Sequence, residues 1–200
     1  MCSTAVLSII FFISLLCLSQ STNGCTKLTT IDTTRQSLKL TNLQSDSNAT
    51  LETKSNTTLE MKPFLIRSES GNIAITLSQH LNDTNSRCYQ IFIEDHATDK
   101  IRMGCLQISD SWSDSRDQKG YQCKKQFILS QDDVDFVMLF RIYSDGVIEL
   151  KINNKTRFIY KDRKTPIDVK YISVASTEPD SYNEFYFNCF EEATNTIKYF

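Results

Sequence analysis

Short segments in which apolar and polar residues alternate recur along this chain from Pro63 to Cys189. The alternation is clearest in residues 73–77 and 89–93. A period of two places one set of side chains on a single face of a β-strand. About ten such segments follow one another at short spacing, and none carries the 3.6-residue pattern of an amphipathic helix. The sequence therefore predicts an all-β fold, an antiparallel β-sandwich or jelly roll of about ten strands.

Two connections between these segments carry hairpin signals. Asp145-Gly146 separates two apolar runs, and this dipeptide favours a type I′ turn, which needs a positive φ at both central positions. Residues 95–98 form the turn of a second hairpin. If Glu94 faces Asp99 across that turn, Cys88 faces Cys105, and directly opposed Cα atoms about 4.5–5.5 Å apart are within reach of a disulfide.

Residues 1–21 have the character of a secretory signal peptide. Ala5 to Ser19 is an uncharged apolar run, too short for a transmembrane helix and of the length of a signal-peptide core. Cleavage after Ser21 or Gly24 fits the small residues that follow, and an uncleaved anchor is the alternative. No later stretch is long enough to span a bilayer. We therefore expect a secreted, extracellular protein without membrane contact after cleavage.

The remainder is predicted to hold one domain between two flanking segments. Residues 22–62 are rich in Ser, Thr and Asn, and we expect a flexible or loosely docked lead-in with one candidate strand at 38–40. Residues 63–190 form the β-sandwich domain, and 191–200 form a C-terminal tail. A chain of 200 residues that is 40% hydrophobic can bury a core of this size.

Beyond the signal peptide the chain has five cysteines, which suits one or two disulfides in an oxidising compartment. None forms a C-x-x-C motif, so a redox or zinc motif is not predicted. Cys88–Cys105 is one candidate pair from the register above, and Cys105–Cys123 is its competitor. Partners for Cys25 and Cys189 stay open. Since five is odd, one thiol is free or forms a covalent dimer with a second chain.

Four Asn-x-Ser/Thr sequons support the secretory route. Each requires a surface position to be used for N-glycosylation. Some sequons arise by chance in a chain this rich in Ser and Thr. The four acceptor residues are Asn48, Asn56, Asn82 and Asn154.

Charge and motif content exclude several classes of function. The formal net charge is −2, from 22 basic and 24 acidic residues, and no basic run exceeds a pair. This balance argues against nucleic acid as the main partner. No two glycines have G-x-G-x-x-G spacing, and the two histidines complete neither a zinc site nor a catalytic triad. We therefore predict no cofactor, no metal and no catalytic residue.

Three aromatic residues are candidate ligand contacts. Trp112 and Tyr121 lie in or beside a polar loop, where they could stack on a sugar ring or on a side chain of a partner. Packing of Trp112 against the end of the sandwich is the alternative, because tryptophan is mostly buried. Tyr182 precedes the last predicted strand and is the third candidate.

Several strand patterns resemble the farnesoic acid O-methyltransferase-like domain of arthropod proteins. The resemblance covers about Lys62 to Cys189, and its matching segments are Phe64–Ser68, Asn72–Ser78, Tyr89–Ile93, Lys100–Arg102, Phe136–Leu150, Phe158–Asp162, Pro166, Val169 and Tyr171–Thr177. The chain departs from the family at Glu94-Asp95-His96, where a Gly-Gly or Gly-Trp is usual. The family name implies methyl transfer, but no S-adenosylmethionine loop is present.

Three functions remain open from sequence. The leading hypothesis is a non-enzymatic extracellular recognition module that binds a glycan or a protein. The second is an enzyme that acts on a small isoprenoid acid, as the family name implies. The third is an inert structural or carrier protein of a secreted fluid. Fold and function are separable, so the resemblance does not decide among them.

Overall fold

The structure is a computed structural model of the chain. It describes residues 25–32, 34–40, 57–68, 72–81, 86–96, 101–109, 123–130, 135–191 and 196–197. The predicted signal peptide lies outside these residues. Within them, no helix has the length and apolar character needed to cross a membrane.

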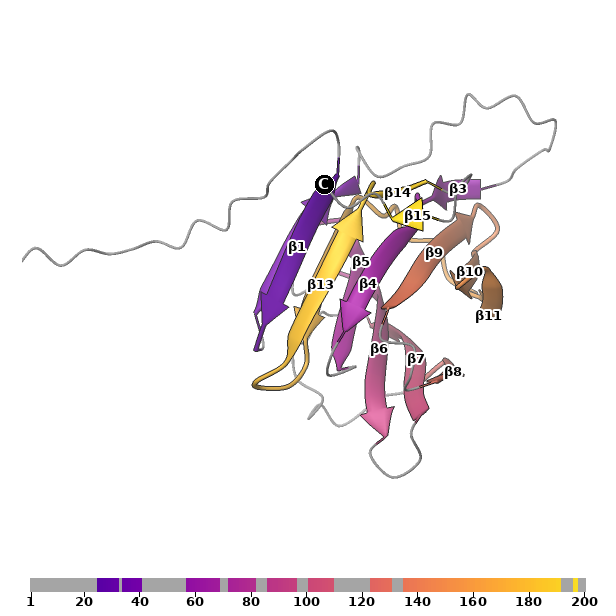
Figure 1. Cartoon of the computed structure of the whole chain (residues 1–200). Coiled ribbons are helices and arrows are strands. Elements are labelled where there is room, and N and C mark those ends of the chain that lie inside the picture. The colour runs from indigo at the N-terminus through magenta and orange to yellow at the C-terminus, as the bar shows by residue number, and fades with distance from the viewer. Residues whose placement is uncertain are drawn as a thin grey trace, which may run out of the picture.

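Two antiparallel sheets of the described residues pack face to face, and β14 and β15 form a separate two-stranded sheet (Figure 1). The seven-stranded sheet has the order β1-β13-β4-β9-β10-β11, with β3 beside β9, and the six-stranded sheet has the order β2-β12-β5-β6-β7-β8. The strands are β1 Thr26–Ile31, β2 Arg35–Lys39, β3 Thr57–Glu60, β4 Phe64–Ser68, β5 Ile73–Ser78, β6 Cys88–His96, β7 Ile101–Ser109, β8 Lys125–Ser130, β9 Asp135–Tyr143, β10 Val147–Ile152, β11 Lys155–Lys161, β12 Tyr171–Ser176, β13 Tyr182–Phe187, β14 Phe190–Glu191 and β15 Thr196–Ile197. The predicted antiparallel β-sandwich is confirmed.

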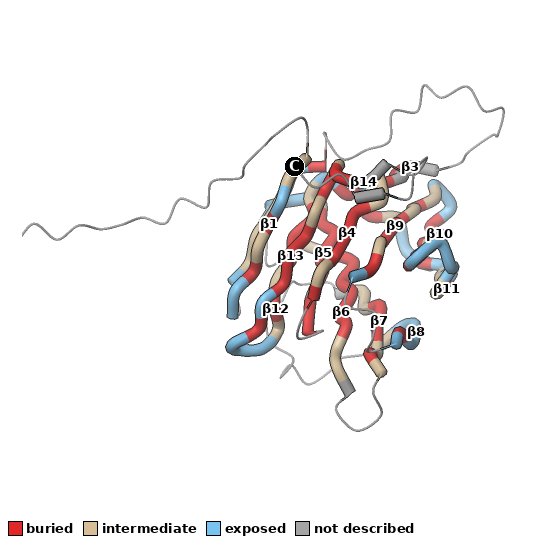
Figure 2. Tube along the Cα trace, in the orientation of Figure 1, coloured by how far each residue is buried: buried red, intermediate tan, exposed pale blue. Residues whose placement is uncertain are grey.

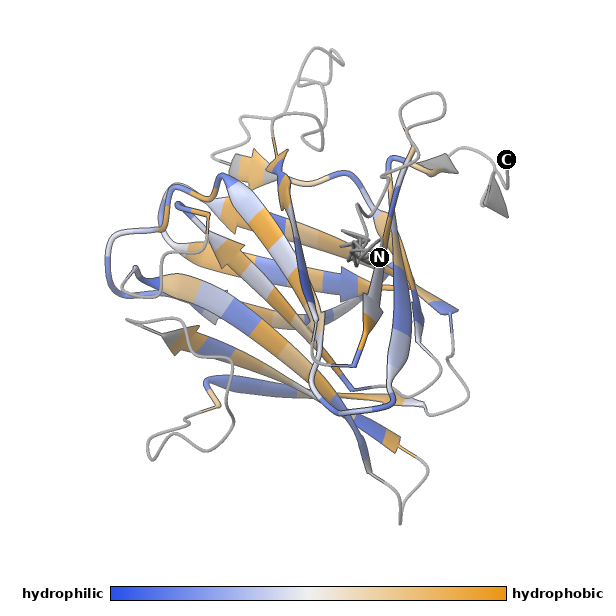
Figure 3. Cartoon of the chain, turned by 90° about the vertical axis from the view of Figure 1, so that its left-hand side faces the viewer, coloured by the Kyte–Doolittle hydropathy of each residue, from blue (hydrophilic) through white to orange (hydrophobic). Residues whose placement is uncertain are grey.

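The core lies between the two sheets and is made of alternate residues from each strand. Ile75 and Val174 from the six-stranded sheet, and Phe140 and Phe185 from the seven-stranded sheet, are at most 1% exposed. Figure 2 shows the buried positions along β4, β5 and β13, and Figure 3 shows hydrophobic and hydrophilic residues alternating along the strands. The period-two pattern therefore places one face of each sheet inside and the other outside.

Residues 22–62 were predicted as a flexible lead-in, but the structure places three strands there. β1 pairs with β13, and β2 pairs with β12. The hydrophobic pattern of β1 is weak because the inward position of Thr30 is polar, and its hydroxyl lies 2.8 Å from the Ser176 hydroxyl of the other sheet. A satisfied hydrogen bond allows a polar side chain to occupy a core position.

The connection between β9 and β10 differs from the predicted type I′ turn. Gly146 has φ 86°, but Asp145 is not among the residues with positive φ, so only one of the two positions is left-handed. The turn between β10 and β11 instead has positive φ at two consecutive positions, 51° at Asn153 and 60° at Asn154. Asparagine adopts this conformation at low cost, so it can replace glycine in such a turn.

Two disulfides join Cys25 to Cys189 and Cys105 to Cys123. The proposed Cys88–Cys105 pair is wrong, because Cys88 faces Ser109 and Cys105 faces Phe92. The β6–β7 hairpin is longer than predicted: Glu94 faces Met103, and pairing continues to His96. The competing Cys105–Cys123 pair is the one that forms.

Cys88 is the described cysteine outside both disulfides, and it is 1% exposed. Burial raises the pKa of its thiol to about 12, although the nearby Arg35 charge opposes this. A covalent dimer through Cys88 would require this thiol to become exposed first.

Candidate recognition surface on the seven-stranded sheet

The outer face of β13 carries three polar side chains at every second position. Tyr182, Glu184 and Tyr186 point away from the core, while Asn183, Phe185 and Phe187 point into it. Strand periodicity alone produces this arrangement. The neighbouring strands add Lys27 from β1, which faces Tyr186, and Arg67 from β4, which faces Glu184.

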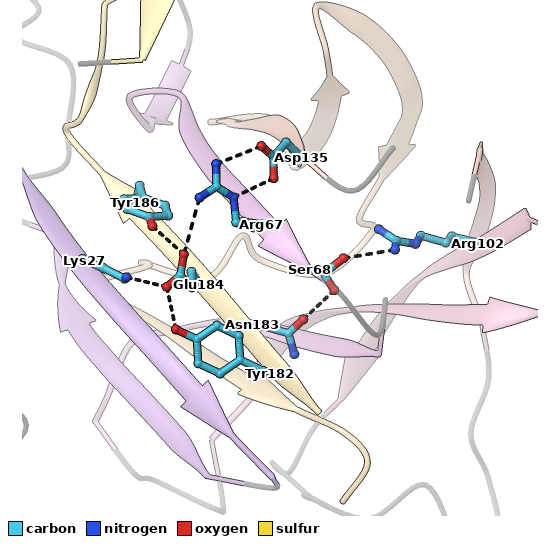
Figure 4. A network of polar contacts seen from close by, with 9 residues as sticks. All are labelled: Lys27, Arg67, Ser68, Arg102, Asp135, Tyr182, Asn183, Glu184 and Tyr186. Atoms are coloured by element: carbon cyan, nitrogen blue, oxygen red, sulfur yellow. Dashed lines mark hydrogen bonds and ion pairs between the residues drawn. The ribbon is translucent and has the colours of Figure 1, made fainter. Parts of the chain in front are cut away.

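Glu184 lies at the centre of this cluster (Figure 4). Its Oε1 accepts hydrogen bonds from Lys27 Nζ and from Tyr182 Oη, the latter at 2.6 Å. Its Oε2 accepts from Tyr186 Oη and forms an ion pair with Arg67 Nη1 at 3.9 Å. A carboxylate offers about four acceptor positions. Glu184 therefore accepts three hydrogen bonds from the protein itself and pairs with one further cation.

The electrostatics of the cluster fix the charge of Glu184. Burial alone would raise its pKa, but the hydrogen bonds from Lys27 and the two tyrosines outweigh burial and hold the pKa at about 2. The same contacts raise the pKa of Tyr182, chiefly through its hydrogen bond to Glu184. At neutral pH the carboxylate is thus ionised and both phenols are protonated, which keeps every donor aimed at its acceptor.

Arg67 links the cluster to the next strand. Its Nε and Nη2 donate to the two oxygens of Asp135 in β9, at 3.0 and 3.1 Å. This bidentate geometry fixes the plane of the guanidinium group. The contacts therefore connect β1, β13, β4 and β9 on one outer face. We call Lys27, Arg67, Tyr182, Glu184 and Tyr186 the tyrosine platform.

A second network lies on the inner side of the same strands. Ser68 Oγ donates to Asn183 Oδ1, and Asn183 Nδ2 donates to Ser176 Oγ at 2.7 Å. Arg102, which is 1% exposed, donates from Nη2 to the Ser68 carbonyl at 3.1 Å and from Nε to Asp95 at 2.8 Å. These bonds bridge the two sheets beneath the platform, so the strands that carry it are held to the other layer.

The tyrosine platform is accessible. Tyr182 is 37% exposed, the side chain of Lys27 is 42% exposed and that of Arg67 is 33% exposed. Ile31 faces Tyr182 across the β1–β13 pair and is 54% exposed. The surface thus combines an aromatic ring, an apolar side chain and two cations, all in positions set by the sheet.

Other predicted site residues lie elsewhere. Trp112 and Tyr121 are outside the described residues, and so are the sequon residues Asn48, Asn56 and Asn82. Asn154 is exposed, in the turn between β10 and β11. Among the described residues, no group of three His, Cys, Asp or Glu side chains is arranged to hold a metal ion.

No family model and no curated protein matches the sequence, so the resemblance to the farnesoic acid O-methyltransferase-like domain stays a prediction.

Several solved structures are similar to this chain. The carbohydrate recognition domain of Emp46p, in its potassium-bound form, is 13% identical, with 86% of this chain and 94% of that chain covered and a TM-score of 0.49. A legume lectin-like domain from Entamoeba histolytica is 16% identical, with 64% and 76% covered and a TM-score of 0.40. The β-glucanase of Bacillus licheniformis is 9% identical, with 82% and 76% covered and a TM-score of 0.42. All three TM-scores are below 0.5, so the proposals that follow rest on the residues of this chain.

Proposed function

We propose that this protein is a secreted recognition module that binds carbohydrate through the tyrosine platform. The observation that carries the proposal is the exposed Tyr182, anchored through its hydroxyl to the Glu184 carboxylate, which Lys27 and Tyr186 also hold in place. An aromatic ring held in place loses little conformational entropy on binding. The platform is therefore organised before a ligand arrives.

The chemistry of the platform suits a sugar. A pyranose ring has an apolar face of C–H groups, which packs on an aromatic ring, and hydroxyl groups around its rim, which need hydrogen-bond partners. Tyr182 supplies the ring. Lys27 supplies ammonium hydrogens, since an ammonium group has three donors and one contacts Glu184. Glu184 positions these groups through its hydrogen bonds to Lys27 and Tyr182.

The proposal involves binding without catalysis. A carboxylate with a pKa of about 2 carries no proton to donate near neutral pH. The two disulfides support the secreted location, because such bonds persist in oxidising compartments. The exposed Asn154 turn is a suitable position for an N-linked glycan.

A glycan array tests the proposal with three proteins. We expect the wild type to bind one class of saccharide, and Tyr182→Ala to lose most of that signal because the stacking surface is removed. Ile159→Ala is the matched control, since Ile159 is 60% exposed on the outer face of β11 in the same sheet. Tyr182→Phe separates the ring from the hydroxyl anchor, and should bind more weakly than wild type but better than Tyr182→Ala.

Two results would overturn the proposal. One is a folded wild-type protein that binds no glycan on the array. The other is a Tyr182→Ala variant that binds as well as the Ile159→Ala control.

A further inference from the structure

Basic residues that are far apart in the sequence gather at one end of the six-stranded sheet. Its neighbouring strands are all antiparallel, so β2, β5 and β7 end where β12, β6 and β8 begin. Cations stand at or beside four of these six strand termini, and the connection between β11 and β12 adds two more. We call these residues the basic end: Lys39, Arg87, Lys124, Lys125, Arg163, Lys164 and Lys170.

Main-chain contacts fix the order of these residues across the sheet. Lys170, which precedes β12, donates its N–H to the Ser78 carbonyl at 2.8 Å, and Ser78 faces Cys88, the first residue of β6. Lys124, which precedes β8, donates its N–H to the Leu106 carbonyl of β7 at 2.7 Å. Neighbouring strands lie about 4.8 Å apart, so the basic end extends over about 24 Å from β2 to β8.

A buried carboxylate holds the bend that carries Arg163 and Lys164. Asp162 is 4% exposed, and its Oδ2 accepts hydrogen bonds from Arg87 Nη2 and from Tyr89 Oη, the latter at 3.1 Å. Its Oδ1 accepts from the N–H of Lys164 at 3.1 Å. The bend that presents the exposed Arg163 is therefore fixed before a ligand arrives, which lowers the entropy cost of binding.

Positive charge exceeds negative charge at the basic end. Each acid among the described residues of this end is paired with a cation, in the pairs Asp162–Arg87, Asp168–Lys170 and Asp145–Lys161. The exposed cations that have no carboxylate partner in the described part of the chain are Lys39, Lys125 and Arg163.

The connections at the opposite end of the sandwich carry exposed acids instead. Asp32 lies between β1 and β2, and Glu178 and Asp180 lie between β12 and β13. A ligand with many negative charges is therefore attracted to one end of the molecule and repelled by the other.

The length of the basic end favours an extended ligand over a small ion. A single sulfate or phosphate group would contact one or two of these cations, whereas a linear polyanion can contact cations from β2 to β8. The two disulfides are typical of oxidising compartments, which favours an extracellular polysaccharide over nucleic acid.

We propose that the basic end binds a linear acidic polysaccharide through its sulfate or carboxylate groups. This site does not depend on the tyrosine platform, which lies on the outer face of the other sheet. Each site can therefore fail without the other.

Binding of the folded protein without residues 1–21 to immobilised heparin tests the ligand class. We expect heparin to bind, hyaluronan to compete more weakly because its charge density is lower, and neutral dextran not to compete. If Lys39, Lys125 and Arg163 each contact one anionic group, the affinity should fall about 40-fold between about 50 and 200 mM NaCl. A heparin disaccharide should compete about tenfold less well than a dodecasaccharide, because it cannot span the strands.

Variants assign the binding to named residues. Arg163→Ala should weaken heparin binding and lower the slope of the salt dependence by about one. Lys155→Ala is the matched control, because it removes one exposed positive charge from the opposite end of the sandwich. Both side chains are exposed, so chemical denaturation should find the two variants as stable as wild type. Tyr182→Ala should leave heparin binding unchanged, which distinguishes this site from the platform.

Three results would overturn the proposal. One is a folded wild-type protein that does not bind heparin at the lower salt concentration. Another is a Lys155→Ala variant that loses as much affinity as Arg163→Ala. The third is single-stranded DNA that competes better than a heparin oligosaccharide of equal charge, which would assign the basic end to nucleic acid.

Discussion

The two outer faces of the sandwich satisfy their polar groups in different ways. On the seven-stranded sheet, Glu184 and Glu149 each contact four side chains of the same face. Glu149 contacts Tyr143 and Arg141 through Oε2, and Thr156 and Lys151 through Oε1, at 3.1–3.6 Å. On the six-stranded sheet, an uncharged outer row runs across four strands, and Arg35 donates to one of its members, Ser173. The row is Ser37, Ser173, Thr76 and Gln90.

The two outer faces should therefore respond differently to mutation. A face whose donors and acceptors satisfy one another has fixed side chains, and a ligand gains from their shape and ring surfaces. A face of uncharged side chains that are themselves mostly buried, such as Ser173, Thr76 and Gln90, has no such network of charges. Mutations should separate the two faces, because only the first loses charged hydrogen bonds when one side chain is replaced.

Removal of a disulfide should give the largest change in the free energy of unfolding. Each sheet has one such bond: Cys25–Cys189 links the β1 and β13 segments of the seven-stranded sheet, and Cys105–Cys123 links the β7 and β8 segments of the six-stranded sheet. Replacing Cys25 and Cys189 by Ser should cost about 3–5 kcal/mol, because the closed segment spans 164 residues. Replacing Cys105 and Cys123 by Ser should cost about 2–3 kcal/mol for a separation of 18. Urea unfolding of both variants measures the difference. A greater loss for the shorter loop would show that chain entropy does not set the ranking.

Glu184→Gln should destabilise the protein by about 1–3 kcal/mol, because three hydrogen-bond donors and the Arg67 cation lose a charged acceptor. Glu149→Gln is the matched control on the same face and should behave similarly. Gln90→Leu should leave stability unchanged or raise it, because leucine of similar size removes a polar group from a position that is 3% exposed. Chemical denaturation checks all three. The contrast between the faces fails if Gln90→Leu proves as damaging as Glu184→Gln.

Acid should weaken the tyrosine platform over a defined pH window. The pKa of Glu184 is about 2 in the folded protein, against an ordinary value of 4.5. Between these values the unfolded chain binds the proton and the folded chain does not, so stability falls as the pH falls from about 4.5 to about 2. Melting temperature measured over this range should drop less in Glu184→Gln. If the melting temperatures of variant and wild type fell equally with pH, Glu184 would not be the group responsible.

The smallest expected effect concerns Cys88 on the six-stranded sheet. With a pKa of about 12, its thiol holds almost no thiolate at pH 8, and it is buried. We expect the folded protein without residues 1–21 to resist iodoacetamide, and one cysteine to react after unfolding without reductant. Cys88→Ala should change stability by no more than about 1 kcal/mol. Rapid labelling of the folded protein would show that Cys88 becomes exposed without global unfolding.

Much of the fold could be predicted from the sequence because most inward positions are apolar. The exception was β1, where Thr30 replaces an apolar residue and is satisfied by Ser176 across the sandwich. Local patterns hold no information about such a distant hydrogen bond. The cysteine pairing failed for a related reason, because alternation identifies β6 and β7 but not the residue at which their turn begins.

The platform was predictable only in part. Tyr182 was a candidate contact, and the Tyr-x-Glu-x-Tyr spacing of β13 indicates that all three side chains share one face. Lys27, however, is 157 residues from Glu184 in the chain. Only the pairing of the first strand with β13 brings these two together, and sequence periodicity does not specify which strands pair.

The Cys25–Cys189 bond has a mechanical consequence. It fastens the residue before β1 to the residue that follows β13 by two positions, with 4.7 Å between the two Cα atoms. A force that pulled apart the segments preceding Cys25 and following Cys189 would pass through the sulfur–sulfur bond. The hydrogen bonds between β1 and β13, and the tyrosine platform across them, would carry almost no load until that bond was reduced.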